Sequence, residues 1–170
     1  MILELDKYQE TKEKLFPNKK VVCTCGWFDP LHPGHASLIM ESKKLGDILV
    51  VLVNGDQMAV TKKGKPFMPA QDRADIVDCI KGVDYTVIYD HPTEYSILGG
   101  LQIIKPDVFA KGGDRDLKDA DDPNSPVNKE RAFIESYGGQ IVYGVGKDKV
   151  WSSSNYLQEW VDFTNSSEHN

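Results

Sequence analysis

The sequence predicts an α/β protein built on a parallel sheet of about five strands with helices on both faces. Segments rich in apolar residues alternate along the chain with segments of helical periodicity, which is the pattern of βαβ crossover units. The segment ILVVLVN, residues 48–54, is apolar at nearly every position, as a strand covered on both faces must be. With 170 residues, 40% of them hydrophobic, the chain is long enough for one domain with a substantial core.

Each predicted strand is an apolar run bounded by turn-forming residues, and the five runs cover residues 19–25, 48–56, 85–90, 107–114 and 140–145. Each predicted helix has apolar positions three or four residues apart, and the helices cover residues 1–16, 35–47, 70–83, 95–106, 131–139 and 152–163. The first helix is expected to end before Pro17, because proline interrupts a helix. The glycine pair Gly99-Gly100 is expected to interrupt the fourth.

Three segments lack both patterns. Residues 61–69 are expected to form a basic loop, and residues 115–130 an acid-rich, solvated insertion that lacks the glycine and the closing glutamate of a calcium-binding EF-hand. The polar tail 164–170 is expected to be disordered. We therefore divide the chain into a helical N-terminal appendage over 1–19 and one domain over 20–163.

The charge balance argues against a general nucleic-acid-binding surface. Lysine and arginine number 20 against 26 aspartates and glutamates, so the net charge is -6 and the isoelectric point is about 5.2. Any phosphate ligand must therefore be met by a local group of cations or by helix N-termini. We see neither a secretory signal nor an apolar run of membrane-spanning length, and so expect no membrane association and a cytoplasmic location.

The three cysteines, Cys23, Cys25 and Cys79, favour neither a disulfide framework nor a zinc site, because their number is odd and their spacing lacks paired ligands. Cys23 and Cys25 stand two apart in a predicted strand and so share one face, where we expect small core residues. No residue is assigned as a protein ligand of a metal.

The segment CGWFDPLHPGH, residues 25–35, joins the first predicted strand to the next helix. Ligands of open parallel sheets bind at the carboxyl ends of strands, and a helix beginning near Pro33 presents N–H groups and a positive dipole end to an anion. Gly34 lets a phosphate approach the backbone closely. His32 and His35 would then donate hydrogen bonds to charge developing on a phosphate. The alternative is a pair of solvent-facing turn histidines.

This segment resembles the G-x-F-D-x-x-H-x-G-H signature of the cytidylyltransferase-like nucleotidyltransferases, with matches at Gly26, Phe28, Asp29, His32, Gly34 and His35. The resemblance covers roughly residues 20–160. It implies a Rossmann-like fold and transfer of a nucleoside monophosphate from an NTP to a small phosphorylated acceptor, with release of pyrophosphate. It also implies that His32 and His35 contact the phosphates of the NTP.

Three further stretches resemble the adenylyltransferase domain of the bacterial heptose synthesis enzyme: LVNGD with DRADIV, then KPDVFAKGGD, then SSSNYL. The resemblance implies that the serine run, Ser152 to Ser154, begins the final helix and holds the β- and γ-phosphates. Hydroxyls and N–H groups at a helix start bind anions on physical grounds as well, although plain N-capping needs only one serine.

The stretch VTKKGKP concentrates Lys62, Lys63 and Lys65 in an otherwise acidic protein. Lysines on a mobile loop can close over phosphates and neutralise a departing pyrophosphate, and the resemblance implies a lysine with this role. A solvated surface turn is the alternative. Arg73 matches a family arginine that helps to hold the nucleotide or the acceptor phosphate, and a surface position on a helix is its alternative.

Together these observations assign His32, His35 and Lys62 as catalytic candidates. Asn54, Asp56 and Arg73 are acceptor-binding candidates, and the nucleotide-binding candidates are Gly26, Trp27, Phe28, Asp29, Gly34, Lys111, Gly112, Asp114, Ser152, Ser153 and Ser154. Asp29 is expected to order its turn or to support a metal. The glycine pair after Lys111 permits backbone contacts to a base or ribose, or else forms an ordinary turn.

The predicted function is nucleotidyl transfer with Mg²⁺ accompanying the NTP, and the heptose-enzyme resemblance favours adenylyl transfer to a sugar 1-phosphate. Cytidylyl transfer to glycerol 3-phosphate or a related alcohol phosphate stays open, as does a non-catalytic nucleotide-binding regulator. Absence of a Walker A sequence, of a G-x-G-x-x-G after a strand and of a serine-nucleophile elbow disfavours P-loop kinases, dinucleotide dehydrogenases and serine hydrolases. The N-terminal helix is a candidate contact for a homodimer.

Overall fold

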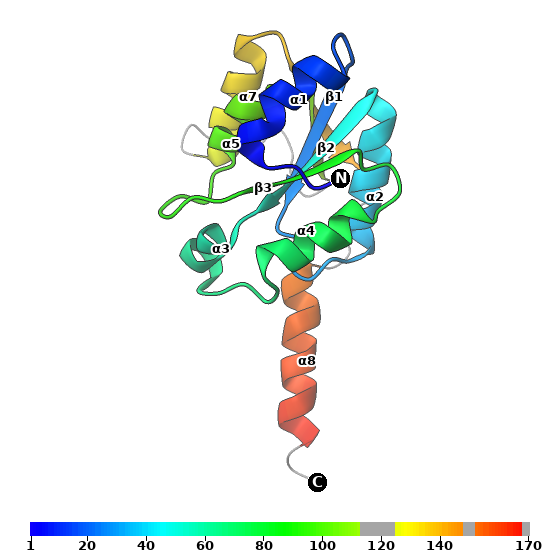
Figure 1. Ribbon diagram of the computed structural model, residues 1–170. Helices are drawn as coiled ribbons and strands as arrows, with labels where there is room; N and C mark the ends of the chain where they lie inside the picture. Colours follow the sequence, from blue (N-terminus) through cyan, green and yellow to red (C-terminus); the bar gives the residue numbers. More distant parts are fainter. Residues whose placement is uncertain (113–124, 148–151, 168–170) are drawn as a thin grey trace.

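A five-stranded parallel sheet forms the centre of the protein (Figure 1). The structure is a computed structural model that describes residues 1–112, 125–147 and 152–167. The strands lie in the order β3-β2-β1-β4-β5, and every neighbouring pair is parallel. Their bounds are β1 Val21–Gly26, β2 Ile48–Asn54, β3 Tyr85–Tyr89, β4 Val108–Gly112 and β5 Gln140–Val145. The predicted fold class is confirmed.

Helices cover both faces of the sheet. On one face lie α1 (Tyr8–Leu15), α5 (Leu98–Ile104) and α7 (Pro126–Ser136), and on the other α2 (Pro33–Ser42) and α4 (Ala70–Asp78). Alternate residues of β2 enter two separate cores, since Val50 and Leu52 pack with α5 whereas Val51 and Val53 pack with α2 and α4. The continuous apolar run of β2 is explained by this double coverage.

Carboxylates fix the amino-terminal ends of the strands. Asp107 accepts a hydrogen bond from the N–H of Val21 at 2.7 Å, and Asp84 accepts one from the N–H of Leu49 at 2.7 Å. Both N–H groups begin strands and would otherwise lack a partner in the ladder. These bonds fix the amino-terminal ends of β1 and β2, and ligands of open parallel sheets bind at the opposite, carboxyl ends of the strands.

The N-terminal segment packs against the domain. The N–H of Leu3 donates to the carbonyl of Thr86 in β3 at 2.9 Å, a short 3₁₀ turn follows at Leu5–Lys7, and Tyr8 and Phe16 are buried in the core. These contacts join the expected appendage to the sheet, and the domain boundary at residue 19 stays a prediction.

The structure differs from the expected elements at α3 (Asp56–Lys63), which is a helix where a loop was predicted from Thr61 on. Its start is capped from a distance, because the Asp90 carboxylate at the end of β3 accepts the N–H groups of Gln57 and Met58 at 3.2 and 3.0 Å. A cap that comes from another strand leaves no signal in the local sequence.

Two other helices also exceed the predicted bounds. The helix α7 begins at Pro126 with Ser125 as its N-cap, inside the segment predicted as an acidic loop, of which residues 115–124 lie outside the described part of the chain. The final helix α8 (Ser153–Ser167) continues through residues 164–167, which were expected to be disordered, and projects from the domain (Figure 1). None of the helices in the described ranges has the length and hydropathy that crossing a membrane requires.

The cysteines occupy three different environments. Cys23 is fully buried in the core and Cys25 is half-buried on the same face, as predicted, whereas Cys79 is exposed just after α4. Burial raises the pKa of the Cys23 thiol well above its ordinary value, so this thiol is held protonated and is not a nucleophile.

The glycine pair lies within α5 and does not interrupt it, which corrects the prediction. A Cβ atom at Gly100 would lie 2.6 Å from Leu52 Cδ1, and one at Gly99 would lie 2.2 Å from the Tyr89 hydroxyl oxygen. The pair therefore lets the first turn of α5 approach the sheet more closely than any residue with a side chain would permit.

Replacement of Gly100 by alanine is expected to destabilise the protein, although alanine is the better helix former. The added methyl group overpacks the contact with Leu52, and we expect a loss of about 1–3 kcal/mol in the free energy of unfolding. Thermal unfolding measures this change, with Gln102→Ala on the exposed side of α5 as the matched control. A G100A protein that melts at or above the wild-type temperature would contradict the close packing of α5.

Candidate active site

A cavity of about 730 Å³ opens at the carboxyl ends of the strands, between the starts of α2 and α8. It brings together residues that are more than a hundred positions apart in sequence. Of the residues assigned from the sequence, it is lined by Gly26, Trp27, His32, Gly34, His35, Asn54, Lys62, Lys111, Gly112, Ser152, Ser153 and Ser154. Phe28, Asp29, Asp56 and Arg73 lie outside this lining, and Asp114 lies outside the described residues.

The two histidines form a stacked pair at the start of α2. Their ring centroids are 3.7 Å apart with an angle of 23° between the planes. Nδ1 of His32 accepts the N–H of Gly34 at 3.2 Å, and Nδ1 of His35 accepts the N–H of His32 at 3.4 Å. Because each Nδ1 acts as an acceptor, a neutral ring carries its proton on Nε2. Each ring therefore offers one N–H donor, and both rings line the cavity.

Small and aromatic neighbours hold this pair in place. His32 is the N-cap of α2, and Pro33 occupies the first helical position, where its missing N–H costs nothing. A Cβ atom at Gly34 would lie 3.0 Å from the His32 ring, so glycine makes room for the ring. Phe28 is fully buried and meets the His35 ring edge-on at 5.0 Å, which makes it a support for His35.

Asp29 orders the turn, one of the two roles predicted for it. The carboxylate is 2% exposed and accepts hydrogen bonds from the N–H groups of Phe67 and Met68 at 2.9 and 2.8 Å. It thereby ties the turn after β1 to the segment between α3 and α4.

Arg73 is completely buried and lies behind the cavity wall. Its guanidinium donates to the carbonyls of Trp27, Asn54 and Met68 at 2.8, 2.6 and 2.9 Å, and to the Asp56 carboxylate at 2.7 Å. Two of the three predicted acceptor-binding residues, Arg73 and Asp56, are thus paired with each other, and Arg73 is also bonded to the backbone. Arg73 ties the end of β1 to the end of β2 and to the first residue of α3.

The predicted catalytic lysine lies between two aromatic rings. Lys62 Nζ is 5.3 Å from the centroid of the Trp27 ring and 5.4 Å from that of the Tyr95 ring, and Lys63 Nζ is 5.2 Å from the Trp27 centroid. Partial loss of hydration lowers the pKa of Lys63, and the nearby Asp29 carboxylate opposes this shift. Both lysines line the cavity from the end of α3.

Lys111, at the end of β4, pairs with Glu130 of α7. Their Nζ and Oε2 atoms are 2.7 Å apart, and both side chains are less than a tenth exposed. Lys111 also lies 4.6 Å from the centroid of the Phe109 ring. The pair forms a neutralised patch on the cavity wall, in which the carboxylate offsets the charge of the predicted nucleotide-binding lysine.

The three serines at the start of α8 have different partners. Ser152 and Asn155 form a reciprocal cap, in which the N–H of Ser152 donates to Asn155 Oδ1 at 2.9 Å and the N–H of Asn155 donates to Ser152 Oγ at 3.3 Å. The Ser153 hydroxyl donates to the carbonyl of Pro30 at 2.8 Å and so ties α8 to the histidine turn. Ser154 lines the cavity as well, and the helix dipole adds a positive end there.

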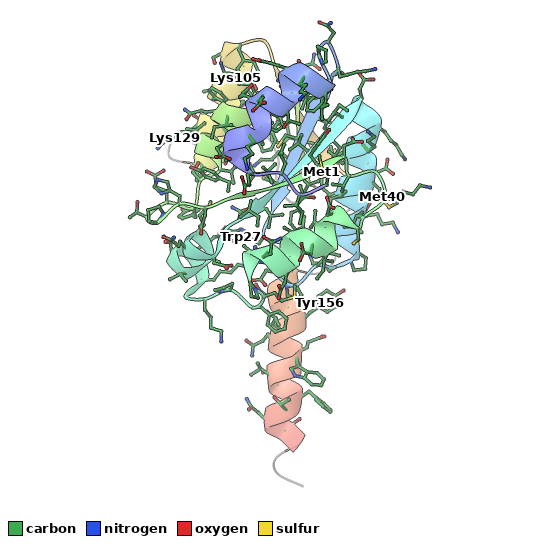
Figure 2. All side chains as sticks on the ribbon, viewed as in Figure 1. Met1, Trp27, Met40, Lys105, Lys129 and Tyr156 are labelled. Carbon is green, nitrogen blue, oxygen red and sulfur yellow. The ribbon has the colours of Figure 1, made fainter. Side chains whose placement is uncertain are left out.

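Sequence reasoning did not assign the polar or charged side chains of Tyr95, Glu130, Lys147 and Tyr156 to the site, although all four line the cavity. Tyr156 stands in the first turn of α8 with its ring 6.2 Å from that of His32 (Figure 2). Tyr95 lay in a predicted helix and Glu130 in a predicted loop, and neither belongs to a recognisable sequence motif. Only Tyr156 carried a signal, since it directly follows the serine run.

Comparison with known proteins gives a family match. The model of the family described as cytidylyltransferase-like matches residues 23–159. The bifunctional protein HldE of Helicobacter pylori is 39% identical over 136 residues, and that of Wolinella succinogenes is 35% identical over 149 residues. These alignments cover 79% and 86% of this chain but only 28% and 30% of the relatives, so the chain spans under a third of their length.

Solved structures agree with the fold. The lipopolysaccharide core biosynthesis protein of Thermoplasma volcanium superposes with a TM-score of 0.62 at 28% identity, over 77% of this chain and all of that one. A pantoate-beta-alanine ligase of Francisella tularensis superposes with a TM-score of 0.63 over 92% of this chain and 72% of that one. Its 16% identity shows a shared fold alone.

Replacement of Arg73 by alanine is expected to lower the free energy of unfolding by roughly 3 kcal/mol, because it leaves three carbonyls and one carboxylate without their donor. Urea denaturation measures the change, with Gln71→Ala on the exposed side of α4 as the control. If R73A matched the control in stability while nucleotide binding was lost, Arg73 would instead belong to the ligand-binding residues.

Proposed function

The chain belongs to the cytidylyltransferase-like family of nucleotidyltransferases, and on that premise we propose that it transfers a nucleoside monophosphate from an NTP to a small phosphorylated acceptor, releasing pyrophosphate. The observation that carries the proposal is the stacked histidine pair, with both Nδ1 atoms engaged, at a helix N-terminus inside a cavity of about 730 Å³. The arrangement supplies N–H donors and cations to a phosphate chain.

The histidines act by hydrogen bonding in this proposal. An oxygen of the acceptor phosphate attacks the α-phosphorus of the NTP in line, and negative charge spreads over the oxygens around that phosphorus. His32 and His35 donate from Nε2 to those oxygens, and the dipole of α2 adds to their effect. The backbone bonds to Nδ1 fix the rings before the substrate arrives, so little reorganisation is needed.

The leaving group is held at the opposite helix. In this proposal the N-terminus of α8, with Ser152, Ser153 and Ser154, binds the β- and γ-phosphates. Lys62 supplies a positive charge over the reacting phosphates from the end of α3. No covalent intermediate with the protein is required, because positioning and charge neutralisation account for catalysis.

Mg²⁺ enters as part of the substrate. Within the described residues no group of three or more His, Cys, Asp or Glu side chains is arranged to hold a metal ion, and Glu130 is the one carboxylate among the described residues that line the cavity. We therefore expect the phosphates of the NTP to carry Mg²⁺, which offsets part of their charge.

We propose adenylyl transfer to a sugar 1-phosphate as the specific reaction. The relatives of Helicobacter pylori and Wolinella succinogenes, at 39% and 35% identity, are HldE proteins, and a solved relative at 28% identity is named for biosynthesis of the lipopolysaccharide core, which is carbohydrate. Cytidylyl transfer to glycerol 3-phosphate is the second candidate, favoured by the description of the matching family.

Pyrophosphate release tests the reaction and both specificities together. We expect release with one of ATP, CTP, GTP and UTP, in the presence of Mg²⁺ and one member of a panel of sugar 1-phosphates, glycerol 3-phosphate and other alcohol phosphates. Mass spectrometry then identifies the nucleotidyl product. NTP binding without release across the panel would contradict the transferase proposal and favour a regulatory nucleotide-binding role.

Replacement of His35 by alanine is expected to lower kcat at least about a hundredfold, the effect of removing one preorganised donor at a developing oxyanion. Steady-state pyrophosphate release measures the change. Thermal unfolding is the control, because loss of the edge contact with Phe28 must be separated from loss of catalysis. Turnover near the wild-type rate would remove His35 from the mechanism.

A further inference from the structure

The cavity has two chemically different sides, separated by β1. Toward β4 and β5 it is bordered by the Lys111–Glu130 pair, and beside the histidine turn by the serines at the start of α8, where the Ser153 hydroxyl donates to the carbonyl of Pro30. Toward β2 and β3 it is bordered by two aromatic rings, Trp27 after β1 and Tyr95 in the segment between β3 and α5. Polar groups and a helix end characterise the first side, and two aromatic rings beside the lysines of α3 characterise the second.

The two aromatic residues border one shared space. One ammonium group, Lys62 Nζ, lies within 5.4 Å of both ring centroids, and Lys63 Nζ lies 5.2 Å from the Trp27 ring. Tyr95 is 47% exposed and Trp27 is half-buried against the α5 core, so each presents part of its ring to the cavity. A ligand at this position meets two aromatic surfaces with a positive charge between them.

The backbone of Trp27 is held in place before any ligand binds. Its carbonyl accepts a hydrogen bond from the buried Arg73 guanidinium, which also holds the carbonyl of Asn54 at the end of β2. Figure 2 shows Trp27 near the end of the domain where α3 and α4 lie. The backbone position from which the Trp27 side chain extends is therefore the same before and after binding.

The geometry of in-line displacement decides which substrate occupies this side. The nucleophile and the leaving group stand on opposite sides of the phosphorus that is attacked. If the nucleotide lies along Lys111 and Gly112 at the end of β4, with its β- and γ-phosphates at the start of α8, the β2–β3 side of the histidine pair is left for the acceptor. This step rests on the proposed function.

We infer that Trp27 and Tyr95 form the acceptor platform, a surface that binds the ring of a phosphorylated sugar, with Lys62 placed for the phosphate of that sugar. The C–H faces of a pyranose ring are flat and apolar and pack against aromatic rings, while its hydroxyls stay at the polar edge. An open-chain polyol phosphate offers no such face. Trp27, assigned from the sequence to nucleotide binding, is placed on the acceptor side by this inference.

Steady-state kinetics show whether Trp27 contacts the acceptor or the NTP, because each substrate has its own KM. Replacement of Trp27 by alanine is expected to raise the KM for the sugar phosphate about tenfold and to leave the KM for the NTP within about twofold, because only the acceptor loses a contact. Trp27→Phe keeps an aromatic face and is expected to recover most of the loss. Trp160→Ala on the projecting part of α8 is the matched control and is expected to be unchanged.

Tyr95→Ala is a second variant, needed in case Trp27→Ala disturbs folding. Tyr95 is more exposed than Trp27, so its removal leaves the core intact. It is expected to shift the acceptor KM in the same direction. An increase in the KM for the NTP with an unchanged acceptor KM, in either variant, would overturn the inference and return Trp27 to the nucleotide side.

A binding measurement keeps the test independent of turnover. In a Trp151→Phe, Trp160→Phe background, Trp27 is the only tryptophan of the chain, and its emission is followed during titration with six- and seven-carbon aldose 1-phosphates and with glycerol 3-phosphate. A saturable change with an aldose 1-phosphate, and a weaker one with glycerol 3-phosphate, supports the platform even if no pyrophosphate is released. The absence of a change with every aldose phosphate would overturn it.

Discussion

The buried guanidinium of Arg73 is the interaction on which the ligand end of the sheet depends. Strands β1 and β2 are paired with each other up to Gly26 and Val53, and beyond that point no ladder bond joins the two. Arg73 supplies donors to the carbonyls of Trp27 and Asn54 and holds Asp56 at the start of α3. Removal of a cation from water is costly, and here four hydrogen bonds offset that cost. The turn that carries the histidines is therefore anchored from behind.

Local charge explains how an acidic protein can receive a polyanion. The chain carries a net charge of -6, yet four lysines line the cavity, and Glu130 offsets one of them. The remaining positive field is reinforced by the N-termini of α2 and α8, which meet at the same end of the sheet. Because these dipoles and charges are concentrated in one cavity, the net charge of the whole protein does not predict the charge of its ligand.

The sequence predicted the fold, and it singled out the histidine turn and the serine run that line one cavity, because all of these depend on local patterns. Strand and helix alternation predicted the sheet, and the histidine turn and the serine run each lie at the start of a helix. The predictions failed where a partner comes from a distant element. Asp90 caps α3 across 32 to 33 positions, and Glu130 reaches Lys111 from α7. The bonds of Arg73 to the strand-end carbonyls were not visible in the sequence, because the orientation of α4 relative to the strand ends is a tertiary property.

The three thiols of the chain differ in exposure, and only Cys79 is exposed to solvent. Cys23 is shut in the core, Cys25 is half-buried beside the cavity, and Cys79 stands in solvent where α4 ends, next to the Asp78 that contacts β3. That position is at the opposite end of α4 from the histidine turn, since α4 begins beside the segment held by Asp29. A dye or a surface tether coupled through Cys79 therefore leaves the mouth of the cavity open, and no cysteine has to be introduced for such work.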